Sequence, residues 1–125
     1  MVPQDFYVFP DDLYRLASAS DPKLTRVRPK RDADLVEQNG VVIVLANNRG
    51  ISLYTRSGVI QERLTRWAWR IRKGTILPQR LKLHRDRPEH YMICPIVTMP
   101  LSEYTGLLEQ LVLHCERVFK VASVV

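Results

Sequence analysis

Short strand-like segments, each bounded by turn residues, recur along this chain and limit what it can fold into. Three of them carry one polar side chain beside the turn: RGISLY at residues 49–54, GTILP at 74–78 and HYMICP at 90–95. Side chains at strand ends next to loops commonly line binding clefts. The sequence therefore predicts a sheet of short strands that gathers polar groups at the strand ends.

The rest of the chain fills in a mostly antiparallel core. Strands are predicted at residues 12–17, 41–46, 51–55, 67–71, 81–83 and 91–97. The continuous apolar run at 41–46 predicts a strand buried on both faces, with turns following at 47–50 and at Ser57-Gly58. Trp67 and Trp69 alternate with arginines, which predicts that both indoles face the core.

Two helices are predicted. A stripe of Tyr104, Leu107, Leu108, Leu111, Cys115 and Val118 predicts a helix over about residues 101–119. Thr98 or Ser102 is its expected cap, with Glu103 in its first turn. A shorter helix is expected over 32–38, ended by Asn39-Gly40. Together these elements predict the α+β class, in one domain of 125 residues.

Composition limits the partners. The chain has 19 Lys and Arg against 13 Asp and Glu, a formal net charge of +6, which favours nucleic acid, a phosphate-bearing cofactor or an acidic protein. No apolar run approaches the roughly 20 residues of a membrane helix, and the first residues lack the pattern of a secretory signal. Cys94 and Cys115 lie in apolar segments without C-x-x-C spacing, so we expect buried thiols.

Three polar residues are candidates for chemistry. Arg15 lies inside the apolar LYRL segment, where its planar guanidinium suits a phosphate, although an outward-facing, solvated arginine fits equally well. Ser52 follows the turn at Gly50; a glycine there lets a ligand approach the backbone, but an ordinary hairpin has the same pattern. His90 begins a strand, where it could serve in acid–base catalysis or be a surface histidine without a specific function. The three histidines show no metal-ligand spacing, so no metal site is predicted.

A nucleic-acid interpretation rests on different residues. Arg66 and Arg70 flank Trp67 and Trp69, and a basic run at 23–31 contains Lys23, Arg26, Arg28, Lys30 and Arg31. Aromatic rings stack on bases while arginines hold phosphates. The period-two spacing of the tryptophans favours core packing instead. The basic run is more typical of a solvated loop than of a specific site, although it could hold an acidic partner.

Taken in order, these segments resemble the toxin family named for the second exported effector of the type VI secretion system, an ADP-ribosyltransferase-like group. That family has a Leu-Tyr-Arg strand, matched here by residues 13–15, and a Gly-Thr-Ser-Val-Phe strand, matched by 50–54. A Gly-Thr-x-Ile-Pro step follows at 74–78, and a His-Tyr-x-Ile-x-Pro strand at 90–95. The resemblance covers roughly residues 13–117, with no match at 18–40.

The resemblance implies a split antiparallel sheet with flanking helices that clamps nicotinamide adenine dinucleotide (NAD) as substrate, and a transfer that passes through a ribosyl cation as nicotinamide leaves. It implies catalytic roles for Arg15, Ser52 and His90. Arg15 would hold a phosphate or the nicotinamide-side ribose, Ser52 would brace the nicotinamide pocket, and His90 would lie at the rim of the cleft near the ribose. The NAD-binding residues it implies are Tyr14, Arg15, Gly50, Ser52, Tyr54 and Tyr91.

Two departures from the family pattern bear on mechanism. Ile51 replaces the threonine of the family's Thr-Ser pair, and the Glu-x-Glu motif of many ADP-ribosyltransferases is absent, leaving Glu89 as the nearest carboxylate. These departures are compatible with ADP-ribosyl transfer to a different acceptor, with weak transfer or with no transfer. They are also compatible with a protein that keeps the fold and only binds a partner.

The biological setting that follows from the resemblance is a bacterial toxin. It would act in the bacterial cytoplasm, delivered by contact-dependent secretion on a secretion-system carrier, and be neutralised by a cognate immunity or antitoxin protein. We expect that partner to be acidic, because opposite charges speed association. The acceptor is left open between protein, nucleic acid and small molecule. The alternative is a nucleic-acid-directed toxin or binding module without NAD chemistry, and no membrane role is expected.

Overall fold

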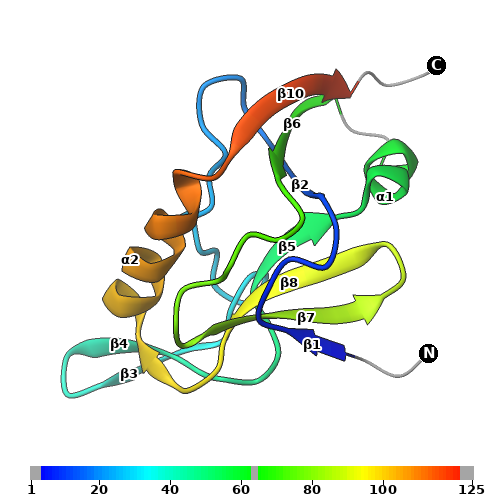
Figure 1. The fold of residues 1–125 in the computed structure, drawn as a ribbon. Helices are drawn as coiled ribbons and strands as arrows, with labels where there is room; N and C mark the ends of the chain where they lie inside the picture. The colour runs from blue at the N-terminus through cyan, green and yellow to red at the C-terminus, as the bar shows by residue number, and fades with distance from the viewer. Residues whose placement is uncertain (1–3, 63–64, 122–125) are drawn as a thin grey trace.

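A long antiparallel sheet, a small second sheet and two helices make up the structure (Figure 1), a computed structural model that describes residues 4–62 and 65–121. The elements are β1 (Gln4–Phe6), β2 (Leu13–Ala17), β3 (Leu35–Gln38), β4 (Val41–Val44), β5 (Ile51–Tyr54), α1 (Arg56–Gln61), β6 (Arg66–Ile71), β7 (Leu81–Arg87), β8 (His90–Pro95), β9 (Met99–Pro100), α2 (Leu101–Val112) and β10 (Glu116–Val121). The predicted α+β class with a mostly antiparallel core is confirmed.

The seven-stranded sheet is divided near its middle. Its order is β1-β7-β8-β5-β2-β6-β10, and every neighbouring pair is antiparallel. β2 pairs with β6 through five residues, but it pairs with β5 only at Tyr14 and Tyr54. Two blocks of strands are therefore joined at a single position, and backbone groups beyond it must find partners outside the sheet ladder.

The larger hydrophobic core lies against helix α2. Tyr104, Leu108 and Leu111 are buried on one stripe of this helix, as its apolar spacing predicts. The Tyr104 hydroxyl donates a 2.5 Å hydrogen bond to the Ile93 carbonyl of β8, which satisfies a buried polar group. A smaller cluster, formed by Tyr14, Leu16, Val59 and Ala68, covers the β2–β6 block.

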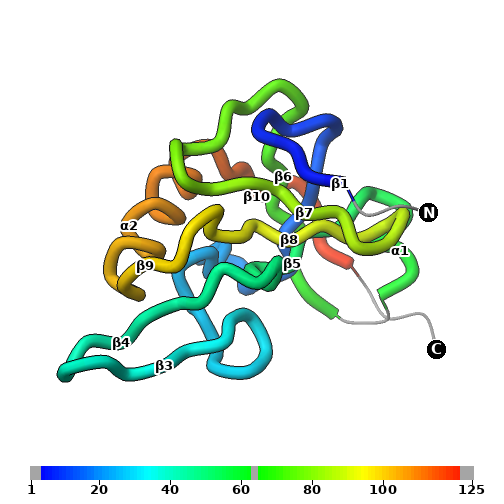
Figure 2. Tube along the Cα trace, turned by 90° about the horizontal axis from the view of Figure 1, so that it is seen from below, coloured from blue at the N-terminus to red at the C-terminus, as the bar shows by residue number. Residues whose placement is uncertain are grey.

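The segment from 32 to 46 differs from the prediction. Residues 35–38 form strand β3, not a helix, and pair with β4 through a turn at Asn39 and Gly40, whose φ angles are +51° and +78°. An Asn-Gly pair in this conformation is typical of a two-residue hairpin. The hairpin extends away from the rest of the molecule (Figure 2), so Val41 and Val42 are exposed rather than buried on both faces.

The last predicted helix is too long. Helix α2 ends at Val112, and the chain turns through Leu113 into strand β10, which pairs with β6. Cys115 and Val118 therefore do not belong to the helix. Pro100 stands at the N-cap position without a side-chain bond, so neither predicted cap is used, and the Thr98 hydroxyl instead accepts from the Ala46 amide at 3.0 Å.

Two further expectations need correction. Ser57 and Gly58 lie in helix α1, where Thr55 is the N-cap and accepts from the Gly58 amide at 3.1 Å. In β6 the fully buried positions are Ala68 and Ile71, whereas Trp67 and Trp69 are half-buried. The reason is that both indoles have local partners: the Arg117 guanidinium lies over the Trp67 ring at 4.6 Å, and the Trp69 indole donates to the Ser18 carbonyl at 2.8 Å.

Both thiols are at least partly buried, as expected, and burial raises the pKa of Cys94 and of Cys115 to about 12. Among the described residues, none of the helices has the length and apolar character needed to cross a membrane.

Candidate active site

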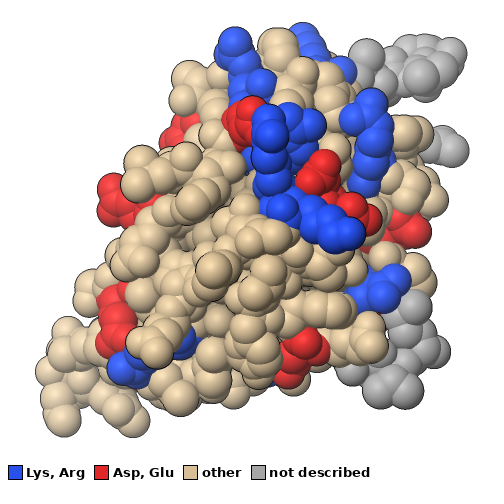
Figure 3. Space-filling view, viewed as in Figure 1, with Lys and Arg blue, Asp and Glu red and all other residues tan. Residues whose placement is uncertain are grey.

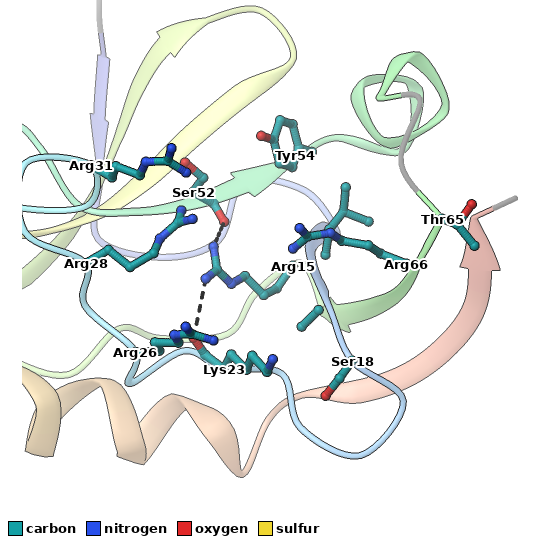
Figure 4. A pocket seen from close by; sticks show the side chains of 12 residues that line it. Arg15, Ser18, Lys23, Arg26, Arg28, Arg31, Ser52, Tyr54, Thr65 and Arg66 are labelled. Atoms are coloured by element: carbon teal, nitrogen blue, oxygen red, sulfur yellow. Dashed lines mark hydrogen bonds between the residues drawn. The ribbon is translucent and has the colours of Figure 1, made fainter. Parts of the chain in front are cut away.

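A pocket of about 600 Å³ lies where the long sheet divides between β2 and β5 (Figure 4). It is lined by Arg15, Leu16, Ala17, Ser18, Lys23, Arg26, Arg28, Arg31, Ser52, Tyr54, Thr65 and Arg66. Six of these described residues are cationic and none is acidic. A hollow with this lining has the size of a small-molecule site and the charge to hold an anion.

Arg15 bridges the division in the sheet. Its Nη1 donates to the Ser52 carbonyl of β5 at 3.1 Å, and its Nη2 donates to the Lys23 carbonyl at 3.4 Å (Figure 4). Its buried Nε has no hydrogen-bond partner among the described residues, and no carboxylate in that part of the chain pairs with it. Burial lowers the pKa of the guanidinium, because desolvation disfavours its charge. An anion in the pocket would offset this cost.

The segment after β2 carries four of the pocket cations: Lys23, Arg26, Arg28 and Arg31. Leu24 and Asp32 are buried, at 0% and 2% exposed, and anchor the segment against the core. Arg28 forms a bidentate pair with Asp32, at 3.0 and 3.2 Å. This pair raises the pKa of Arg28, chiefly through its hydrogen bonds. The positive segment is therefore held in place around the pocket.

A hydrogen-bonded chain connects Ser52 to two residues outside the pocket. His90 Nε2 lies 3.0 Å from Ser52 Oγ, and His90 Nδ1 lies 2.6 Å from Asp86 Oδ1. Because a carboxylate only accepts, Nδ1 carries a proton, and in the neutral ring Nε2 accepts from the serine hydroxyl. Asp86 stands where the β7–β8 register shifts, and such bulges re-aim side chains. His90 is 7% exposed and does not line this pocket, so it acts on the pocket through Ser52 and the Tyr54 ring.

Tyr54 connects the main pocket with a smaller hollow of about 170 Å³ that holds two carboxylates, Glu62 and Glu89. The Tyr54 ring meets His90 edge-on, with ring centroids 5.2 Å apart. Burial, and then the charge of Glu62 and a hydrogen bond to it, raise the pKa of the Tyr54 hydroxyl. Glu89 is engaged differently: it accepts hydrogen bonds from Ser57 and Thr55, which lower the pKa of its carboxyl.

Comparison with known protein families shows to which family this chain belongs. A family model described as the Tse2 ADP-ribosyltransferase toxin matches residues 11–118 of the 125-residue chain. The chain belongs to the Tse2 ADP-ribosyltransferase toxin family. A search of curated proteins found no match. The resemblance inferred from short motifs is thereby confirmed, and the divided sheet is the fold on which this Tse2-family chain places its pocket.

Within this Tse2-family chain, four of the predicted site residues come together. Arg15, Ser52 and Tyr54 line the pocket, and His90 contacts Ser52 and Tyr54 from behind. His90 therefore lies beneath the pocket floor rather than exposed at its rim.

Three other predicted residues are placed elsewhere. Tyr14 is buried on the opposite side of β2 against Phe119, with ring centroids 5.7 Å apart. Tyr91 is buried in the main core against Phe6 at 5.9 Å. Gly50 is needed for strand packing: an added Cβ would lie 1.9 Å from the Ile93 carbonyl oxygen, so the close approach is made by β8 and not by a ligand.

Sequence reasoning did not assign Asp86, Glu62 or the cations of residues 23–31 to this site. Three residues separate Asp86 from His90, and the turn at Pro88-Glu89 pairs His90 with Arg87 rather than with Asp86. Asp86 meets the His90 ring where the β7–β8 register shifts, and no local pattern in the sequence reveals such a shift. The described residues contain no group of three or more metal-ligating side chains.

Proposed function

We propose that this chain is a toxin enzyme that binds NAD in the pocket at the sheet division and transfers its ADP-ribosyl group to an intracellular acceptor. The single observation that carries the proposal is the state of Arg15. Its buried guanidinium has carbonyl partners but no carboxylate among the described residues, in a pocket whose charged lining residues are all cations. Family membership supplies the reaction class.

The pocket fits NAD in volume and charge. Its roughly 600 Å³ lies within the usual range for ligand sites, about 300–1,000 Å³. The pyrophosphate of NAD carries one negative charge on each phosphate, and a guanidinium forms charge-assisted bonds with such oxygens. Arg15, whose guanidinium has no carboxylate partner among the described residues, is the group with which this anion would pair.

The residues around Ser52 have distinct tasks. NAD, when bound, supplies an ADP-ribosyl group: the bond from its ribose to nicotinamide breaks, and the acceptor nucleophile bonds to the ribose carbon and releases its proton. Asp86 fixes the orientation of the His90 ring, and His90 fixes the Ser52 hydroxyl at the pocket wall.

The carboxylate that such chemistry uses to stabilise positive charge is proposed to be Glu62. It lines the hollow beside Tyr54, whereas Glu89 accepts hydrogen bonds from Ser57 of α1 and from the N-cap residue Thr55. A carboxylate at this position favours charge that develops on the ribose.

The proposed biological setting follows from the assignment of this chain as an ADP-ribosyltransferase toxin. The toxin would act in the bacterial cytoplasm after contact-dependent delivery on a secretion-system carrier, and an acidic immunity protein would neutralise it. The supporting observation is the concentration of positive charge around the pocket, which attracts an acidic partner.

The test is expression of wild type, Arg15→Ala and Ser52→Ala in a permissive bacterium, with growth, the NAD pool and labelled ADP-ribose transfer followed together. Arg72→Ala is the control, because Arg72 is an exposed arginine that pairs with Glu116 and does not line the pocket. Thermal midpoints confirm that each variant is folded. We expect both pocket variants to lose toxicity and NAD consumption while Arg72→Ala keeps them. Full toxicity in both folded pocket variants with an unchanged NAD pool contradicts NAD chemistry and favours the nucleic-acid alternative.

A further inference from the structure

We propose that the acceptor of this enzyme is a single-stranded nucleic acid whose phosphates lie along Lys23, Arg26 and Arg31. The inference rests on the proposed NAD-dependent transfer and adds the substrate class of the same pocket. It follows from an excess of positive charge that NAD alone does not neutralise, held in a segment whose structure is fixed by buried residues.

The charges around the pocket do not balance for NAD alone. Among the described residues, six cations line it, and Asp32 neutralises one of them, Arg28. Arg15, at the division of the sheet, is the natural partner of the NAD pyrophosphate, which has one charge on each phosphate. This leaves Lys23, Arg26, Arg31 and Arg66 with more positive charge than the cofactor can match. None of these four side chains has a hydrogen bond or ion pair to the described residues.

Structure, and not only composition, places these cations together. Leu24 and Ala33 are buried at 0% and 1% exposed, and Lys23 and Lys30 adopt positive φ angles of +53° and +66°. A side chain in this left-handed region costs roughly 1–2 kcal/mol, so the segment is held in this shape by its surroundings. The Lys30 carbonyl accepts from Arg49 at 2.9 Å. Like charges held around a hollow at this cost are explained by a polyanionic ligand.

Several arginines outside the pocket lie beside carboxylates, unlike most of the pocket cations. On the face in Figure 3, basic side chains gather over the upper half and acidic side chains lie among them. Strands β6 and β10 show such pairing in detail, because Arg70 and Arg72 both contact Glu116, at 3.1 and 2.7 Å. At the pocket, by contrast, Arg28 is the one lining cation with an ion pair among the described residues, and the guanidinium groups face one another across the hollow (Figure 4).

The aromatic ring in the same pocket favours a nucleic acid over an acidic protein. Tyr54 lines the hollow together with the cations, and bases of single strands stack on such rings while basic side chains track the phosphates. A hydroxyl or amine of the nucleotide would attack the ribose carbon of NAD, nicotinamide would leave neutral with the bonding electron pair, and the nucleophile's proton would pass to solvent.

The test compares two triple variants of equal net charge. Lys23→Gln/Arg26→Gln/Arg31→Gln removes pocket cations, whereas Lys30→Gln/Lys73→Gln/Lys120→Gln removes exposed lysines outside the lining, one of them in the same segment. Binding of fluorescent RNA and DNA single strands of about 12 nucleotides is measured by anisotropy from about 50 to 200 mM salt. A poly-glutamate peptide and NAD are titrated in parallel.

We expect wild type and the control to bind an oligonucleotide with a steep salt dependence. The pocket variant should lose affinity, and its salt slope should fall by about 2, since each phosphate contact on a single strand contributes about 0.7. Equal losses in both variants, no binding by wild type, or binding of poly-glutamate alone would overturn the proposal. Thermal midpoints show whether both variants are folded.

The NAD titration distinguishes failure of the acceptor proposal from failure of the proposed NAD-dependent function. Binding of NAD by wild type without any oligonucleotide binding removes the acceptor proposal and leaves the proposed function standing. Oligonucleotide binding without any NAD binding removes the proposed function. Label transferred from NAD to the oligonucleotide by wild type, and lost in the pocket variant, supports both.

Discussion

Replacing Gly50 with alanine should destabilise this protein strongly, although the change adds one methyl group. A Cβ at this position would lie 1.9 Å from the Ile93 carbonyl oxygen, 2.5 Å from its carbon and 3.0 Å from the Cys94 nitrogen, where ordinary contacts begin at 3.4 Å. All three atoms belong to the backbone of β8, so no side chain can rotate to relieve the overlap.

The expected cost follows from the depth of this overlap. Overpacking of a core typically costs about 1–3 kcal/mol and occasionally more. We expect a loss of at least about 3 kcal/mol, because β5 must separate from β8 along the pairs that position Ser52. Gly106→Ala is the matched control. Its Cβ would meet nothing within 4 Å, and alanine is favoured over glycine inside a helix by about 1 kcal/mol, so this variant should be slightly more stable.

Urea unfolding of wild type and both variants measures the difference, with NAD binding followed on the folded protein. The reasoning is refuted if Gly50→Ala unfolds within about 0.5 kcal/mol of wild type, the scatter of ordinary surface changes. Such a variant that had also lost NAD binding would assign Gly50 to ligand approach and not to strand packing.

Three further predictions concern the surroundings of the pocket. Hydrogen bonds from Ser57 and Thr55 hold the pKa of Glu89 below its ordinary 4.5, so wild type should lose stability as the pH falls below about 4.5. Glu89→Gln should lack this pH-dependent part of the stability. Acid denaturation curves that run parallel for the two proteins would contradict this prediction. Tyr104→Phe leaves a buried carbonyl of Ile93 without its donor and should cost about 1–3 kcal/mol in urea unfolding, and an unchanged midpoint would refute it. Asp86→Ala should slow ADP-ribosyl transfer about tenfold or more at an unchanged thermal midpoint. Asp86→Asn should largely restore the rate, because its amide oxygen still accepts a hydrogen bond from His90. Equal rates in wild type and both variants would show that the His90 ring is oriented without Asp86.

The strands that carry the site could be predicted from the sequence, because alternation and turn residues mark both of them. β2 and β5 lie where the apolar segments at 12–17 and 51–55 predict them. Strand β10 escaped prediction because of a bulge: Arg117 pairs with Trp69 and Phe119 with Ala68, which leaves Val118 as an extra residue and interrupts the alternation. Cys115 and Val118 then continue the helical spacing by coincidence.

The pocket itself could be predicted only in part. Arg15 and Ser52 stand out because each is a polar residue inside an apolar strand, and the structure brings them together across the sheet division. The role of the basic run depends on Asp32, a polar residue whose burial no local pattern reveals. In the segment that follows, Asn39-Gly40 fits both a helix end and a hairpin turn, and pairing with β4 decides for the hairpin.

The most direct test of the central claim is calorimetric titration of NAD into wild type, Arg15→Gln and the control Arg72→Gln, each first shown to be folded by its thermal midpoint. Loss of a hydrogen bond to a charged group costs about 1.5–3 kcal/mol, so Arg15→Gln should weaken NAD binding at least about tenfold. The control, on an exposed arginine paired with Glu116, should leave the dissociation constant unchanged. Equal affinity for NAD in all three proteins, or no binding by wild type, would contradict the assignment of this pocket to NAD.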